Sequence, residues 1–188
     1  MCTRRVEMRD DMKINNSQSA LEQIQQFHQE VDRFASELRG KLGNRIRCRL
    51  GCSECCVDDL TVFTIEALCI KSEFAKLLET ESPASEGACA FLDEAGACRI
   101  YSARPYVCRT QGLPIRWFDE MESGQIAEYR DICPVNDEGP PIEGFEEKLF
   151  LTIGPFEDRL RAIQSAFDHD KMKRVRLRDL FEANCILF

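Results

Sequence analysis

The sequence predicts an α-rich α+β fold, with helices around a loop-dominated, cysteine-rich centre and a short β-hairpin. Three observations support this prediction. A chain of 188 residues is the size of one domain, and it has enough leucine, isoleucine, valine and phenylalanine for a hydrophobic core. Apolar residues recur at helical spacing near both ends of the chain. The middle combines many cysteines with glycine and proline, which favours loops.

The first predicted element is a long amphipathic helix. Residues 1–16 are mostly polar, so we expect a tail there and a single domain over residues 17–188. In residues 17–40 the apolar residues fall at steps of three and four, which places them on one stripe. The stripe consists of Leu21, Ile24, Phe27, Val31, Phe34 and Leu38. Gly40 and Gly43 are suited to ending the helix. His28 lies beside the stripe, and we expect it to be partly buried and hydrogen-bonded rather than a ligand.

The centre, residues 45–135, is predicted to be a cysteine-cluster core with short regular elements. These are a strand at 60–63, a helix at 65–80 capped by Thr64, a hairpin at 88–101 with its turn at 93–96, and a short helix at 103–109. Residues 111–144 contain repeated proline and glycine, and we expect little regular structure there. The C-terminal segment, residues 145–188, is predicted to be helical at 156–167, with an edge strand at 175–177 and a short turn at 179–183.

Charge and hydropathy exclude several classes of function. The formal net charge is −8, which provides no field that would attract nucleic acid or anionic lipid. The basic run at 171–178 has no interleaved aromatic residue, so we expect a solvated edge there. No apolar run approaches the roughly 18 residues of a membrane helix. The N-terminal stretch lacks the apolar segment of a secretory signal. We therefore expect a cytoplasmic protein without nucleic-acid or membrane partners.

Cysteine is the unusual feature of the composition. The chain has 11 cysteines, an odd number, and no export signal, so a disulfide framework is the poorer interpretation. Cysteines this dense in a reducing compartment are typical of a metal site. The eight candidate ligands are Cys48, Cys52, Cys55, Cys56, Cys89, Cys98, Cys108 and Cys133. Four thiolates hold a structural zinc ion or a cubane iron–sulfur cluster. Eight thiols therefore indicate two four-ligand sites, or one site with thiols to spare.

The spacing of these cysteines has a physical meaning. Two residues separate Cys52 from Cys55, so a tight turn can aim both sulfurs at one ion. Cys55 and Cys56 are adjacent, and adjacent side chains diverge, so they would serve two sites or leave one sulfur unligated. Arg104 and Arg109 would offset the negative charge of a thiolate centre. The other three cysteines, Cys2, Cys69 and Cys185, are expected to be structural or incidental.

The combined motifs resemble a known family. Cys52-Ser-Glu-Cys55-Cys56, the Cys89-Ala-Phe-Leu segment, Gly96-Ala-Cys98-Arg-Ile-Tyr and Arg104-Pro105-Tyr-Val-Cys108-Arg109 are similar to the CxxCxxCC, or YkgJ-type, cysteine-cluster proteins. These proteins are described as zinc- or iron-chelating domains. The resemblance covers residues 48–133 and implies that Cys48, Cys52, Cys55, Cys56, Cys89, Cys98 and Cys108 hold metal, with Cys133 as an eighth ligand. The first gap here holds three residues where the family has two. Flagellin lysine methylases have a similar cluster, which adds an enzymatic alternative.

Three rival chemistries have weaker support. Cys48-x-x-x-Cys52-x-x-Cys55 matches the three-cysteine motif of radical S-adenosylmethionine enzymes, but no alternating strands and helices follow to build their barrel. Cys52-x-x-Cys55 does not open a helix of a βαβ unit, as a thiol–disulfide catalyst would. Cysteine hydrolysis would need His28 or His169 as its base, and both lie in polar helical contexts.

Two functions remain for the chain. The first is a metal-binding protein whose thiolates coordinate zinc or an iron–sulfur centre. The alternative is an iron–sulfur enzyme or redox component that performs methyl transfer or electron transfer. The sequence leaves open whether the protein is an enzyme.

Overall fold

The computed structural model describes residues 3–49 and 51–182, with side chains from Gln18 onward, and Cys2 and Cys185 lie outside the described residues. The fold is α+β, as predicted. Its helices are α1 (Thr3–Leu42), α2 (Thr64–Thr80), α3 (Tyr106–Thr110) and α4 (Pro155–Asp168). Strands β1 (Thr61–Phe63) and β5 (Arg174–Arg176) form one small antiparallel sheet. A second sheet contains β2 (Ile115–Glu120), β3 (Ile126–Asp131) and β4 (Leu151–Thr152), in the order β3-β2-β4.

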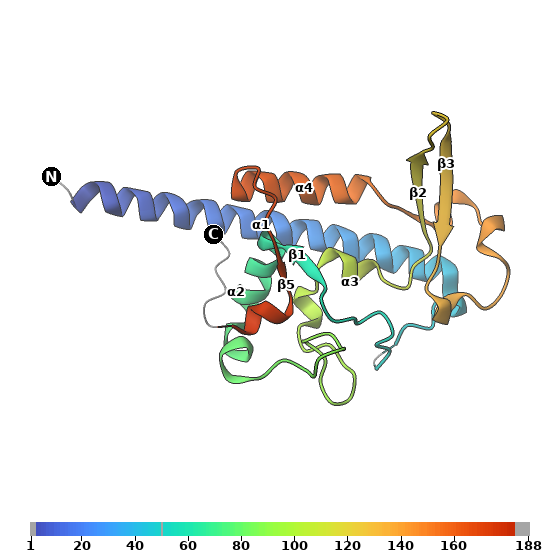
Figure 1. Ribbon diagram of the computed structural model, residues 1–188, viewed down its shortest axis with the longest axis horizontal. Coiled ribbons are helices and arrows are strands. Elements are labelled where there is room, and N and C mark those ends of the chain that lie inside the picture. Colours follow the sequence, from blue (N-terminus) through green and yellow to red (C-terminus); the bar gives the residue numbers. More distant parts are fainter. Residues whose placement is uncertain (1–2, 50, 183–188) are drawn as a thin grey trace.

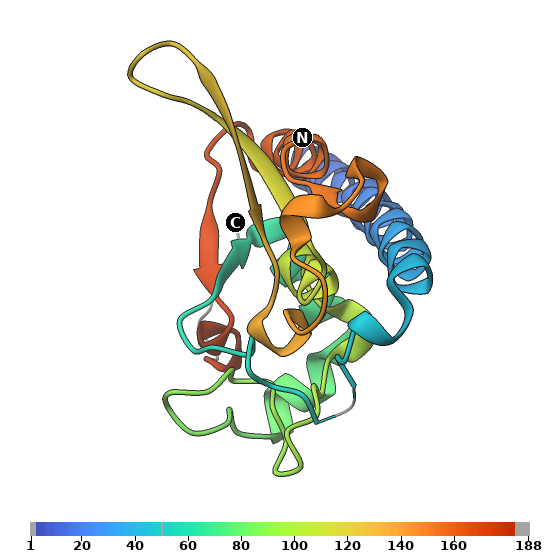
Figure 2. The same ribbon diagram turned by 90° about the vertical axis from the view of Figure 1, so that its right-hand side faces the viewer.

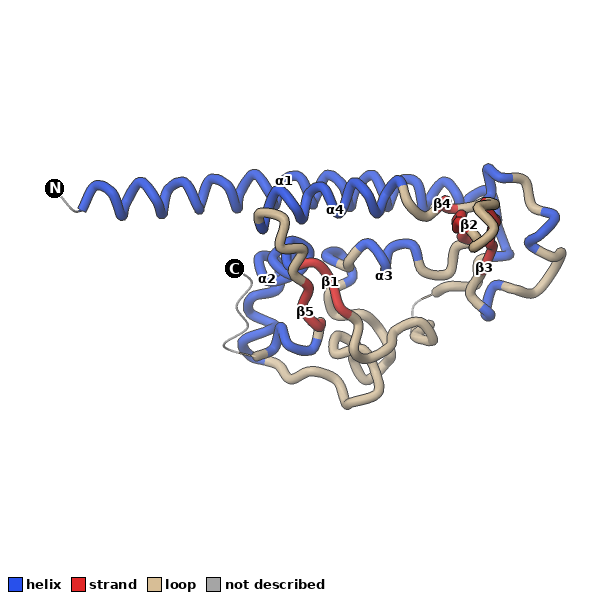
Figure 3. Tube along the Cα trace, turned by 45° about the horizontal axis from the view of Figure 1, so that its top comes forward, coloured by secondary structure: helices blue, strands red, loops and turns tan. Residues whose placement is uncertain are grey.

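Helix α1 runs along the long axis of the molecule and contacts α2, α3 and α4, and α4 lies alongside it (Figures 1 and 3). The predicted stripe faces the core: Ile24, Phe27 and Val31 are at most 1% exposed. Phe156 of α4 packs its ring edge-on against Phe27 and Phe34 of α1. The amphipathic spacing thus produces a helix pair with a shared apolar face.

Helix α1 begins earlier than predicted. Residues 3–16 continue the helix and do not form the polar tail that the sequence suggested. Half of these residues are arginine, glutamate, methionine or lysine, which have high helix propensity, and the segment contains no glycine or proline. Helix propensity thus explains why the helix extends through residues 3–16, although the predicted apolar stripe begins only at Leu21. At its other end α1 stops at Leu42, and Gly43 takes the left-handed conformation (φ 54°).

Strand β1 leads directly into α2, as predicted, but the helix is not capped by Thr64. Phe63 occupies the cap position, and its backbone N–H donates to the Glu66 carboxylate at 3.3 Å. The Thr64 hydroxyl instead accepts a hydrogen bond from the Gln164 amide of α4 at 2.9 Å. β1 pairs with β5 with Val62 opposite Val175, which confirms the predicted strand near residues 175–177.

The β-hairpin of the fold lies at a different place in the sequence. Residues 88–101 form turns with a single β-bridge between Leu92 and Cys98. The hairpin is β2–β3, inside the segment predicted to be irregular. Proline and glycine were the reason for that prediction, yet Pro114 precedes β2, and Gly124, with a φ of 76°, lies in the hairpin turn. Between them the sequence is rich in the aromatic and β-branched residues typical of strands.

A second apolar cluster packs against the cysteine-bearing loops. Phe91 and Ile100 are buried there together with Leu177 and Leu180, and Cys89 and Cys98 pack against this cluster. The Phe91 and Phe181 ring centroids are 5.0 Å apart. The loops that follow Cys89 and Cys98 thus rest on hydrophobic contacts with the C-terminal part of the chain.

We expect Phe91→Ala to lower the free energy of unfolding by about 3–5 kcal/mol, because Phe91 is fully buried and its removal leaves a cavity. Denaturant titration followed by circular dichroism measures the change. Phe118→Ala is the control, since the Phe118 side chain is half exposed. Equal losses for the two variants would contradict a supporting role for Phe91.

Candidate metal centre

Five of the eight predicted cysteines lie in one neighbourhood. They are Cys55, Cys56, Cys89, Cys98 and Cys108, all half-buried and none in a disulfide. The Cys56 pKa is raised mainly by the hydrogen bond with the Cys55 side chain and by burial, and also by the charges of Cys89 and Cys108. The Cys108 pKa is raised to about 12, first by burial and then by the charges of Cys89 and Cys98. Such mutual effects require that these sulfurs lie near one another.

Three segments of the chain bring these sulfurs together. Cys55 and Cys56 lie in the loop before β1, where the Cys56 N–H donates to the Ser53 carbonyl at 2.8 Å. The Cys89 N–H donates to the Cys56 carbonyl at 3.0 Å, which joins the first segment to the second. Cys98 is held near Cys89 by the bridge to Leu92. Cys108 comes from α3, the third segment.

The first two segments are fastened by one arginine from the C-terminal part of the chain. Arg178 forms two parallel hydrogen bonds with the Asp58 carboxylate, each 2.9 Å long. It also donates to the carbonyls of Ala84, Ser85 and Ala88, at 2.7–3.1 Å. Asp58 lies two residues after Cys56, and Ala88 directly precedes Cys89. The Arg178 hydrogen bonds lower the pKa of Asp58 to about 2, so the carboxylate stays ionised at neutral pH.

Two other arginines lie beside the sulfurs. Arg104, one of the predicted cations, contributes through its charge to the lowered pKa of Cys55, and it partly offsets the rise that burial causes in the pKa of Cys98 and Cys108. The charge of Arg99 partly offsets the same rise at Cys89 and Cys98, and its guanidinium donates to the Ala90 carbonyl at 2.6 Å. A guanidinium near several thiolates stabilises their charged form, which is the form that binds metal.

Arg109, the second predicted cation, has a structural role in the described part of the chain. It pairs with Asp32 of α1 and donates to the carbonyls of Arg104 and Ser102, at 2.6 and 2.7 Å. Its side chain is buried. These bonds hold α3, and with it Cys108, against the long helix.

The other three predicted cysteines, Cys48, Cys52 and Cys133, make contacts of their own. Cys48 is exposed, and its sulfur accepts a hydrogen bond from the Asn136 amide at 3.3 Å. A side chain at Gly112 would collide with this sulfur. The Cys133 carbonyl accepts from the Asn136 N–H at 2.7 Å, so Cys48 and Cys133 contact the same asparagine. Cys52 lies in a turn in which its N–H donates to the Arg49 carbonyl.

The donor chemistry fits zinc or iron, but the positions do not yet define a ligand set. Within residues 3–49 and 51–182, no three cysteine, histidine or acidic side chains are arranged so that they could hold a metal ion. The thiols are free, clustered and flanked by guanidinium groups, as thiolate ligands require. The assignment of all eight cysteines as ligands therefore remains a prediction.

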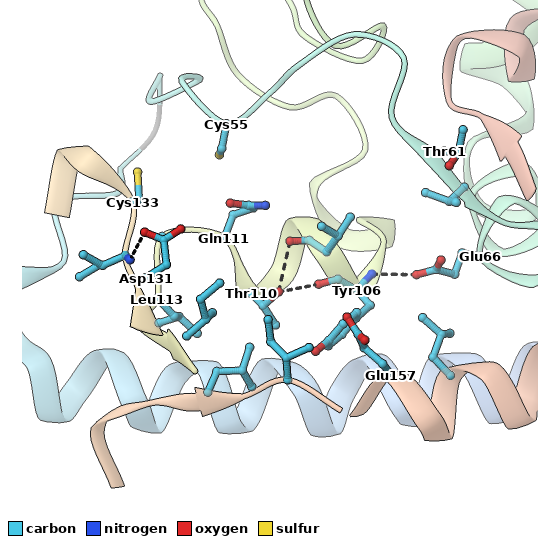
Figure 4. A pocket seen from close by; sticks show the side chains of 18 of the residues that line it. Cys55, Thr61, Glu66, Tyr106, Thr110, Gln111, Leu113, Asp131, Cys133 and Glu157 are labelled. Carbon is cyan, nitrogen blue, oxygen red and sulfur yellow. Dashed lines mark hydrogen bonds between the residues drawn. The ribbon is translucent and has the colours of Figure 1, made fainter. Parts of the chain in front are cut away.

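A cavity of about 700 Å³ adjoins the group. Figure 4 shows Cys55 and Cys133 at this cavity, with Gln111 and Asp131 nearby. Its lining combines apolar side chains from β1, β2 and α3 with the carboxylates of Glu66 and Glu157. Glu66 is buried, accepts the Tyr106 N–H at 2.8 Å, and lies 3.7 Å from Nε2 of His28. His28 is more completely buried than predicted, and its Nε2 has no hydrogen-bond partner among the described residues, contrary to the expected hydrogen bond.

Sequence analysis did not identify this cavity. Its walls come from segments that are far apart in the chain, so no local motif marks Gln111, Asp131 or Glu157 as its lining. Of the lining residues, Glu66 is the one for which the sequence suggests a role, because it lies in the first turn of a predicted helix. That role is an interaction with the helix dipole and does not indicate a cavity.

Comparison with known proteins agrees with the cysteine pattern. Residues 47–134 match the model of the CxxCxxCC family, which is described as a "putative zinc- or iron-chelating domain". All eight candidate cysteines lie within the matched residues. No curated protein and no solved structure matches the chain. Among the described residues, every helix is too short or too polar to cross a membrane.

We expect Arg178→Lys to weaken the cysteine neighbourhood, because lysine cannot form the paired bonds to Asp58 together with those to three carbonyls. The thermal midpoint should fall by several degrees, and the Cys56 and Cys89 thiols should react faster with a thiol reagent. Arg176→Lys is the matched control, since Arg176 is more exposed and pairs with Asp179 and Asp59. Equal reactivity in both variants would contradict the fastening role of Arg178.

Cys69 allows a prediction on pH that is separate from metal binding. This thiol is buried in α2, and burial raises its pKa to about 12. In the unfolded chain the pKa is near 8.5, so above that pH the unfolded state loses the proton more readily than the folded state. Wild type should therefore lose stability relative to Cys69→Ala as the pH rises from about 9 towards 12. Denaturant midpoints across this range measure the difference, and a constant gap would refute it.

Proposed function

We propose that this cytoplasmic protein binds zinc or iron through cysteine thiolates. The observation that carries the proposal is the gathering of five free thiols from three segments inside the matched CxxCxxCC domain. Cys55, Cys56, Cys89, Cys98 and Cys108 are the first candidates for ligands. Cys48, Cys52 and Cys133 would complete a second site or the same one. Four thiolates on a divalent ion carry a net charge of −2, which Arg104 and Arg99 would offset.

The side chains around the sulfurs have defined tasks in this proposal. Arg104 favours the thiolate form of three of the cysteines. Arg178 holds together the loops that carry Cys56 and Cys89. Burial raises the pKa of Cys89, Cys98 and Cys108, so metal binding would displace protons from these thiols. A bound zinc ion would supply structural cross-linking, whereas an iron–sulfur centre would also supply electron transfer.

We expect Cys108→Ser to lower the metal content of protein purified without oxygen by at least half, because Cys108 contributes one of the clustered thiols. Elemental analysis and titration of free thiols measure the loss. Cys69→Ser is the control, since Cys69 lies in the core of α2 and should leave metal content unchanged. Equal metal loss at both positions, or wild-type protein that takes up neither zinc nor iron, would refute the proposal.

The cavity beside Cys55 favours a second candidate, an iron–sulfur enzyme or redox component. A cavity of this size can hold a small molecule next to the sulfurs, which a purely structural zinc site does not need. The same preparation separates the two candidates. Brown protein that contains iron and acid-labile sulfide supports the second, and colourless protein with zinc supports the first.

A further inference from the structure

The β2–β3 hairpin projects from the body of the molecule (Figures 1 and 2). Strand β4 pairs only with Ile115 and Arg116, so beyond these residues the hairpin is a two-stranded ribbon. Four of the six exposed large hydrophobic side chains of the described chain lie on this ribbon. They are Phe118, Met121, Ile126 and Tyr129, and Ile126 is 75% exposed. A two-stranded ribbon has little stability of its own, so it gains from any surface that covers these side chains.

Both faces of the ribbon carry apolar groups. Trp117 lies opposite Tyr129 in the register, and their rings are stacked with centroids 5.5 Å apart at an angle of 17°. Because side chains alternate along a strand, Phe118 and Ile126 share the other face, where they lie opposite Glu128 and Glu120. Phe118, Ile126 and Tyr129 are 42–75% exposed, whereas Trp117 is partly buried.

The outer part of the ribbon is negatively charged. Asp119, Glu120 and Glu122 are exposed, and none has an ion-pair partner among the described residues. Asp119 accepts a hydrogen bond from the Trp117 indole at 3.0 Å. The two arginines of the hairpin lie near its base, where Arg116 pairs with Glu147 and Arg130 with Glu128. The tip therefore combines exposed apolar surface with uncompensated carboxylates.

The outer edge of β3 is open. β3 pairs with β2 alone in the described chain. Near its end, Arg130 donates to the carbonyls of Ile142 and Glu143, which covers that part of the edge. The part nearer the turn, around Ile126 and Glu128, has no such cover. It also lacks the proline, lysine or bulge that commonly protects an exposed edge strand.

We propose that residues 117–129 form a docking site for an extended, basic segment of a partner protein. The segment would add a strand along the open edge of β3, with main-chain hydrogen bonds giving affinity. Its apolar side chains would pack on Phe118 and Ile126. Its lysine or arginine side chains would lie beside Asp119 and over the Trp117–Tyr129 stack, where an aromatic face attracts a cation. Glu120, on the Phe118 and Ile126 face, and Glu122, in the turn, would attract them at longer range.

The negative charge of the hairpin favours a basic peptide segment over nucleic acid, a membrane or a second copy of the chain. An acidic, apolar tip is repelled by nucleic acid and by anionic membranes. A second copy of the chain carries a net charge of −8. The three arginines of its basic run, moreover, are already engaged: Arg174 donates to the Thr61 carbonyl, Arg176 pairs with Asp179, and Arg178 pairs with Asp58. The proposal does not depend on the metal centre and can fail or succeed separately from it.

The test uses the full chain and a short fluorescent peptide that alternates lysine and valine. Fluorescence anisotropy should show binding that weakens as salt is added. The Kd should rise about tenfold for the triple variant Asp119→Asn, Glu120→Gln, Glu122→Gln, and again for Phe118→Ser with Ile126→Ser. The matched control removes three exposed carboxylates elsewhere: Glu22→Gln, Glu37→Gln, Glu79→Gln. It should keep the wild-type Kd, and all variants should keep the wild-type thermal midpoint.

Several outcomes would overturn the proposal. The lysine–valine peptide would fail to bind, or a glutamate–valine peptide would bind as tightly. The control triple would weaken binding as much as the hairpin triple, which would indicate a general charge effect. Sedimentation would show dimers that dissociate in the Phe118→Ser, Ile126→Ser variant, which would assign the hairpin to self-association. Binding to phosphatidylserine vesicles through the hairpin would assign it to a membrane.

Discussion

The arrangement of the cysteine loops depends on the ion pair between Arg178 and Asp58. A guanidinium group has a fixed planar set of donors, and Arg178 uses it for a carboxylate and three carbonyls at once. Those acceptors belong to the two loops that carry Cys56 and Cys89. Loops without regular structure cannot position sulfur atoms by themselves, because their own backbone offers few internal hydrogen bonds. Arg178 supplies that order from outside the matched domain.

The rest of the fold supports the same region from the opposite side. Helix α1 buries its stripe against α2 and α4, and Arg109 ties α3 to α1 through Asp32. A family match confined to residues 47–134 describes the sulfur-bearing part, while the elements on both sides of it provide the rigid frame. The domain and its frame are one packed unit.

The sequence predicted the features that depend on local pattern. The buried faces of α1 and α4 follow from helical spacing, and β1 follows from a short apolar run. The hairpin lies where the prolines and glycines of residues 111–144 predict irregular structure, because Pro114 precedes a strand and Gly124 makes its turn. The hydrogen bond between the Asn136 amide and the Cys48 sulfur joins residues that are far apart in the chain, so cysteine spacing cannot reveal it. The cavity is likewise lined by residues from segments that are far apart in the chain, so local patterns do not reveal it.

The position of Arg178 has a consequence for the order of assembly. A chain is synthesised from its N-terminus, and segments fold as they emerge. Every candidate cysteine precedes Arg178, so all of them leave the ribosome before the residue that clamps two of their loops. During that interval the thiols belong to an unfastened chain that is open to oxidation or to a wrong metal. Binding of the correct metal is therefore expected only after translation is complete, or with the help of a factor that protects the thiols of the nascent chain.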